Sequence, residues 1–104
     1  MPRYIVKLPY QGQDYYLEWS TIVDAPVTYG MLLEEFQQYY RDEYGANGQY
    51  DLPGRLARVD ATGTSSRVGT LAELLASNRA GPDEASLTQE EIIQKFIAER
   101  PEEQ

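Results

Sequence analysis

Adjacent acidic side chains are the first groups in this sequence that could do chemistry. Two carboxylates fixed in a concave site can hydrolyse a glycoside or hold a hard metal ion. Neighbouring residues of a helix point about 100° apart, so such pairs do not converge on one ligand. We therefore expect solvated surface charge, no metal site and no cofactor. The pairs are Glu34-Glu35, Asp42-Glu43, Asp83-Glu84 and Glu90-Glu91.

A second candidate site is the loop Thr62-Gly63-Thr64-Ser65-Ser66-Arg67. Hydroxyl groups, a glycine and an arginine can together bind a phosphate. The loop lacks the Gly/Lys spacing of a P-loop, so an ordinary hydrophilic turn is the alternative. We hypothesise an anion-binding role for three arginines, which could instead pair with acidic residues inside the fold. They are Arg55, Arg58 and Arg67.

Missing residue types exclude several classes of reaction in this chain of 104 residues, which has no His and no Cys. A Ser-His-Asp or Cys-His nucleophile, a thiolate redox centre, a disulfide and a Cys/His zinc site all need one of them. We expect a protein that is not an enzyme. A small enzyme that uses tyrosine, arginine and carboxylate groups in an arginine-lined anion site is a third alternative.

Charge and aromatic residues are concentrated in the same part of the chain. Residues 14–51 hold eight acidic side chains against Arg41 alone, and all nine tyrosines lie within the first fifty residues. The formal net charge is −8, which argues against direct binding to nucleic acid or to an anionic membrane. An acidic, tyrosine-rich surface suits a protein partner with a basic surface, because acids steer the encounter and tyrosines supply contact area.

We hypothesise that one exposed face binds this partner, in its most specific form by nucleic-acid mimicry. Carboxylates would then occupy the phosphate positions in the basic groove of a nucleic-acid-processing or defence enzyme and inhibit it. Small acidic proteins of phages and mobile elements are similar in size and charge, although no motif here identifies a family. The predicted binding residues are Tyr16, Glu18, Glu35, Tyr39, Asp42, Glu43, Tyr50 and Asp51.

Two other interpretations stay open. The acidic residues can serve solubility alone. The chain can also be an adaptor or a self-associating subunit whose contact surface is the apolar C-terminal helix, so a homo-oligomer is one alternative. The apolar residues concerned are Ile92, Ile93, Phe96 and Ile97.

Alternating residue types predict two strands at the N-terminus, over 3–8 and 14–19, with a turn at 9–13. We expect the Tyr15/Leu17/Trp19 face of this hairpin to be buried, because the opposite face carries two acids.

Helix signals cover most of the remaining chain. The spacing predicts a helix over 29–44, capped by Thr28 and ended by a left-handed Gly45, then a loop over 45–50. Segment 52–62 is ambiguous, and we favour a helix over a strand because Asp51 can cap it and Pro53 falls in its first turn.

Two capping boxes predict two further helices, which we expect to end at Gly81-Pro82 and Pro101. The boxes are Thr70-x-x-Glu73 and Thr88-x-x-Glu91.

Together these elements predict an α+β fold, in which three or four short helices pack on one face of the hairpin. We expect a single domain over 1–100 and a frayed acidic tail over 101–104. No run of apolar residues is long enough for a membrane span or resembles a signal peptide, so we expect a cytoplasmic protein.

Overall fold

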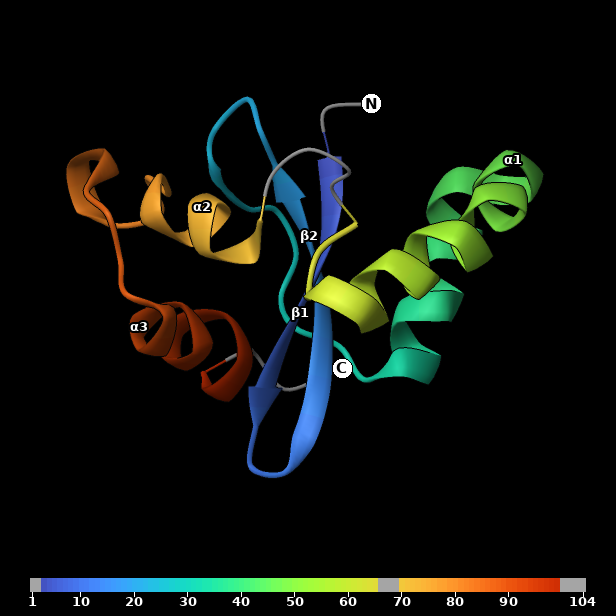
Figure 1. Ribbon diagram of the computed structural model, residues 1–104, viewed down its shortest axis with the longest axis horizontal. Helices are drawn as coiled ribbons and strands as arrows, with labels where there is room; N and C mark the ends of the chain where they lie inside the picture. Colours follow the sequence, from blue (N-terminus) through green and yellow to red (C-terminus); the bar gives the residue numbers. More distant parts are fainter. Residues whose placement is uncertain (1–2, 66–69, 100–104) are drawn as a thin grey trace.

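The N-terminal segment forms an antiparallel hairpin, which the computed structural model describes with the rest of residues 3–65 and 70–99. Strand β1 spans Arg3–Tyr10 and strand β2 spans Gln13–Ser20 (Figure 1), so the predicted hairpin is confirmed. Positive φ angles in a two-residue turn match the right-handed twist of a hairpin. The turn residues are Gln11, with φ 51°, and Gly12, with φ 80°.

Both long edges of the hairpin have backbone partners. Strand β3, Ala25–Pro26, pairs with the end of β2 and completes a sheet in the order β1-β2-β3. Along β1, the Lys7 N–H donates to the Gly63 carbonyl at 2.9 Å, and the Ser65 N–H donates to the Ile5 carbonyl at 2.9 Å. These contacts pair backbone groups at the two edges of the hairpin that would otherwise be free to bind another strand.

Helix α1, Leu33–Thr62, consists of two arms that meet at a sharp kink (Figure 1). Gly45 makes the kink with φ 65° and ψ −150°, so the positive φ predicted for this glycine is confirmed, whereas its ψ is not that of a left-handed helical residue. The predicted loop over 45–50 is wrong, because the chain resumes helical geometry directly after Gly45. We call residues 33–44 the first arm and residues 46–62 the second arm. The favoured helix over 52–62 is confirmed as part of the second arm.

The start of α1 differs from the predicted start at residue 29. The N-cap is Leu32, whose N–H donates to the Glu35 carboxylate at 3.0 Å. Thr28 is not a cap, because its hydroxyl instead accepts the Glu18 N–H of β2 at 3.0 Å. Pairing to the sheet therefore keeps the preceding residues extended and delays the helix.

Two shorter helices follow, each with the predicted capping box. Helix α2 spans Leu71–Ala76, and helix α3 spans Gln89–Ile93 before π-helical turns, η2, over Gln94–Ala98. In both boxes the threonine hydroxyl accepts the glutamate N–H at 3.1 Å and the carboxylate accepts the threonine N–H. Helix α2 ends before the predicted Gly81-Pro82, where the short 3₁₀ turn η1, Pro82–Glu84, begins instead.

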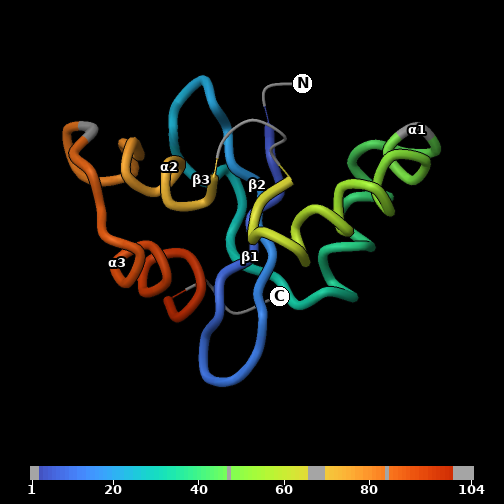
Figure 2. The backbone as a smooth tube through the Cα atoms, viewed as in Figure 1, coloured from blue at the N-terminus to red at the C-terminus, as the bar shows by residue number. Residues whose placement is uncertain are grey.

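Helices cover both faces of the sheet, so the prediction that they share one face is wrong. Figure 2 shows α1 on one side of the hairpin, with α2 and α3 on the other. On the α1 side, Ile5 and Tyr16 pack with Phe36 of the first arm. On the other side, Leu17 and Trp19 pack with α2, α3 and η2. The α+β fold predicted from the sequence is confirmed, with a buried sheet between two helical layers. The predicted tail over 101–104 and the helix end at Pro101 lie outside the described residues.

Asn78 organises the connection between α2 and α3. Its fully buried amide donates to the carbonyls of Leu75 and Leu87 at 2.6 and 2.7 Å. Its side-chain oxygen accepts the N–H groups of Leu87 and Ala80 at 2.8 and 3.2 Å. One side chain therefore replaces the backbone partners that regular secondary structure would supply to this loop.

We expect Asn78→Ala to lower the free energy of unfolding by about 3 kcal/mol, because four partly buried backbone groups lose their hydrogen-bond partner. Denaturant unfolding measures the change. Gln38→Ala is the control, since Gln38 bonds Asp42 on an exposed helix surface and its loss should cost about 0.5 kcal/mol or less. Equal losses in the two variants would contradict this role for Asn78.

Candidate functional site

The eight predicted binding residues divide into an exposed group and a buried group. Tyr16 and Glu18 are 6% and 2% exposed, and Tyr39 is half-buried. These three do not belong to an exposed face, so that part of the prediction is wrong. The other five are exposed on α1: Glu35, Asp42, Glu43, Tyr50 and Asp51.

Glu18 is a buried carboxylate at the centre of a hydrogen-bond network. The Tyr39 hydroxyl donates to it at 2.5 Å, and the Tyr44 hydroxyl at 2.7 Å. The Arg3 guanidinium lies 3.3 Å away and completes an ion pair. Burying a charge is costly unless it is paired and hydrogen-bonded, and these three donors meet that condition. The first arm of α1 is thereby attached to β1 and β2 by polar contacts.

The same network changes the acid–base properties of its tyrosines. Burial, followed by the hydrogen bond to Glu18, raises the pKa of Tyr39 and of Tyr44 above the ordinary value of 10.0. The hydrogen bond that Arg3 donates to the Tyr44 hydroxyl is the largest of the causes that raise the pKa of Arg3. Both hydroxyls therefore stay protonated at neutral pH and keep donating to the carboxylate.

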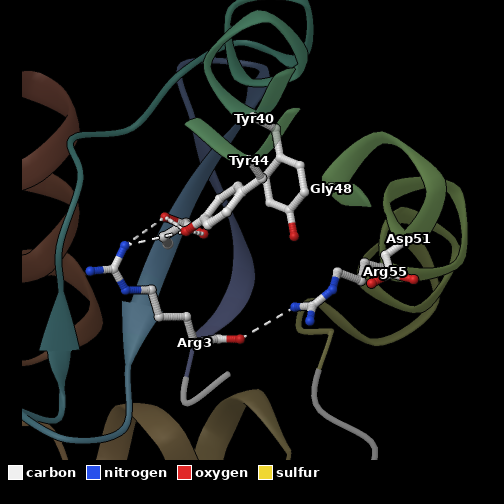
Figure 3. A pocket seen from close by; sticks show the side chains of 7 residues that line it. Arg3, Tyr40, Tyr44, Gly48, Asp51 and Arg55 are labelled. Atoms are coloured by element: carbon white, nitrogen blue, oxygen red, sulfur yellow. Dashed lines mark hydrogen bonds and ion pairs between the residues drawn. The ribbon is translucent and has the colours of Figure 1, made fainter. Parts of the chain in front are cut away.

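A pocket of about 170 Å³ opens beside this network, between the second arm of α1 and the sheet (Figure 3). Arg55 donates from Nη1 to the Arg3 carbonyl at 3.3 Å across one side of it. Gly48 lets the two arms of α1 approach, because a Cβ there would overlap the Tyr44 Cβ. The lining residues are Arg3, Glu18, Tyr40, Tyr44, Gly48, Asp51 and Arg55.

The hydroxyl-rich loop serves the fold in its described part. Thr64 and Ser65 are buried, and the Ser65 hydroxyl accepts the Ile5 N–H of β1 at 2.8 Å. Arg58 donates from Nε to the Ser65 carbonyl at 2.9 Å. Arg58 therefore holds the backbone of this loop, whereas Arg55 lies apart from it in the pocket. Arg67, the third predicted anion-binding residue, lies outside the described residues.

The apolar C-terminal segment is part of the core. Ile92 and Ile97 are 0% and 4% exposed and pack against the sheet with Leu17 and Trp19. Ile93 and Phe96 are partly buried against the same cluster. The residues that would carry the adaptor alternative are therefore largely occupied inside the molecule.

Sequence reasoning missed four residues of the pocket: Arg3, Tyr40, Tyr44 and Gly48. One signal was available, because a two-residue turn at 11–12 places Arg3 diagonal to Glu18 on the same face of the hairpin. Tyr40 and Tyr44 are four residues apart, so their side chains are expected to lie next to each other on one face of the helix. Nothing in the sequence indicated that the second arm would fold back beside them.

Within residues 3–65 and 70–99, no three acidic side chains gather where they could hold a metal ion, and no helix could cross a membrane. Comparisons with protein-family models, with curated proteins and with solved structures find no match to this chain. The choice of function therefore depends on the geometry of its own residues.

Proposed function

We propose that this protein is a non-enzymatic binding module that docks the outer surface of α1 on a basic surface of a partner protein. The observation that carries the proposal is a set of exposed side chains on α1, with five carboxylates, one arginine and a tyrosine that is 86% exposed. We call it the acidic α1 surface. It consists of Glu34, Glu35, Arg41, Asp42, Glu43, Tyr50 and Asp51.

The carboxylates and the exposed ring of Tyr50 act at different stages of binding. Carboxylates on one surface attract a basic partner and orient it before contact. Tyr50 then supplies apolar area and a hydroxyl at low entropic cost, as tyrosines at interfaces do. In its most specific form the mechanism is nucleic-acid mimicry, in which Asp42 and Glu43 take the place of phosphates in the partner's basic groove.

Capture from a native lysate tests the proposal, with bound proteins identified by mass spectrometry at about 0.05 M and about 1 M salt. We expect a basic, nucleic-acid-binding protein that is retained only at low salt, because a Debye length of roughly 3 Å at 1 M screens exposed charges. Reversing two charges, Asp42→Lys with Glu43→Lys, should lower its recovery about tenfold or more.

A matched variant on the opposite side of the sheet controls for net charge. Glu90→Lys with Glu99→Lys changes the formal charge equally, and Glu99 bonds Gln94 much as Asp42 bonds Gln38. We expect the control variant to capture the partner as the unmodified chain does. Equal loss in both variants would show a general charge effect, and no loss in either would place the contact elsewhere; both outcomes contradict the proposal.

A further inference from the structure

Tyr40 carries a hydroxyl that the fold does not use. The residue is only 5% exposed, yet its hydroxyl has no hydrogen-bond partner among the described residues. Its oxygen points into the pocket, on the side where Arg55 lies (Figure 3). Burial raises the pKa of Tyr40, and the charge of Arg55 opposes that rise, so the two groups lie close enough to interact.

Arg55 is the second group with unused capacity. Its one hydrogen bond in the described structure goes to the Arg3 carbonyl, and no described carboxylate lies within ion-pair distance of it. A guanidinium has five N–H donors in a fixed fork, so most of them remain available to a carboxylate. Arg3, in contrast, is already paired with Glu18.

Asp51 adds an unused negative charge to the same pocket. Its carboxylate lines the pocket one helical turn before Arg55 and makes no ion pair in the described structure. The lining residues thus contain two arginines and two acids and have no net charge. A simple anion would meet Asp51 and the overall charge of −8, whereas a simple cation would meet two arginines.

We propose that this pocket binds a small free amino acid. The ligand's carboxylate bonds the Arg55 guanidinium and the Tyr40 hydroxyl, and its ammonium group lies against Asp51. Its side chain packs on the rings of Tyr40 and Tyr44, whose centroids are 4.6 Å apart. A volume of about 170 Å³ limits the ligand to a small molecule, since drug-sized ligands need roughly 300 Å³ or more. This binding site shares only Asp51 with the acidic α1 surface, and its function is separate from the proposed docking.

Thermal shift with the full set of standard amino acids, followed by calorimetry on the compounds that stabilise the protein, tests the proposal. We expect small apolar amino acids such as alanine or valine to bind. Propionate has only the carboxylate and isopropylamine only the amine, so each should bind about tenfold more weakly than alanine or valine.

Three variants assign the contacts. Tyr40→Phe removes a hydroxyl that no described residue uses, so it should weaken amino-acid binding about fivefold to tenfold and leave the unfolding midpoint in place. Asp51→Asn should reduce affinity for the amino acid to that for propionate. Tyr29→Phe, outside the pocket, is the control and should bind as the unmodified chain does.

Three results would overturn the proposal: no amino acid stabilises the protein, propionate binds as tightly as alanine, or Tyr40→Phe leaves affinity unchanged. All three are independent of partner capture. The variant that tests docking changes Asp42 and Glu43, neither of which lines the pocket. Failure of the pocket proposal therefore leaves the docking proposal standing, and the reverse also holds.

Discussion

We expect the protein to unfold steeply as the pH rises above about 10, the value at which tyrosines of the unfolded chain lose their protons. In the folded state burial is the largest cause that raises the pKa of four tyrosines. Asp60 adds to the rise at one of them, and Glu18 adds to it at the others. The four are Tyr16, Tyr39, Tyr40 and Tyr44.

The sign of the effect follows from proton linkage. Below pH 10 these tyrosines are protonated in both states, so their contribution to stability is fully present. Above it the unfolded chain releases protons that the folded chain retains, so stability falls as the pH rises towards the folded pKa values. Four groups that titrate together make the loss steep, and the transition should be complete within about two pH units.

Circular dichroism and tyrosinate absorbance, followed together during an alkaline titration, check this result. We expect the absorbance of the four shielded tyrosines to appear only as the helical signal is lost. Tyr40→Phe should make the transition less steep, since it removes one titrating group and no hydrogen bond within the described structure. Full ionisation of all nine tyrosines with the fold intact would contradict the burial described for Tyr16, Tyr39, Tyr40 and Tyr44.

Replacing the buried carboxylate should have the second large effect. We expect Glu18→Gln to lower the free energy of unfolding by about 3 kcal/mol at neutral pH. The amide keeps one acceptor oxygen but presents N–H groups to the hydroxyls of Tyr39 and Tyr44, which donate to the carboxylate in the native protein. Arg3 also loses the negative charge with which it pairs. Denaturant unfolding measures the loss.

An exposed glutamate supplies the control for this substitution. Glu43→Gln makes the same chemical change on the acidic α1 surface, where a loss of about 0.5 kcal/mol or less is expected. Glu43→Gln should lower the recovery of the partner more than Glu18→Gln does, because Glu43 is exposed and Glu18 is buried. A Glu18→Gln chain as stable as the Glu43→Gln chain would contradict the structural role of the network.

Local signals in the sequence predicted the elements of this fold well. Alternation predicted the hairpin, and both capping boxes predicted helices that form with the expected hydrogen bonds. The positive φ angle of Gly45 was also correctly expected. Each of these features depends on residues a few positions apart, so the sequence contains all the information they need.

Burial of Glu18 could not be predicted by the same means. Alternation along β2 places Glu18 on the side of the strand away from its apolar residues, where an acidic side chain usually faces water. What reverses the expectation is a set of partners from elsewhere: Tyr39 and Tyr44 from α1 and Arg3 from β1. These three donors make an inward carboxylate acceptable. The hairpin register alone places Arg3 near it, whereas only the tertiary structure brings Tyr39 and Tyr44 to it.

The placement of the helices on both faces of the sheet could not be predicted from local sequence patterns either. Tyr16 on the supposedly outer face of the hairpin packs on Phe36, with ring centroids 6.0 Å apart, so that face needs a helical cover of its own. The kink at Gly45 then returns the second arm beside the first and creates the pocket. A tyrosine fits a wet or a dry surface equally well, which is why its burial could not be assigned in advance.

Contact between a partner and the acidic α1 surface is tested most directly by a footprint of the captured partner on the chain. Amide resonances of the isotope-labelled chain would be compared with and without that partner at low salt. We predict changes concentrated on residues 33–51, with Tyr50 among the largest. Changes confined to residues 71–99, with α1 unaffected, would contradict the account.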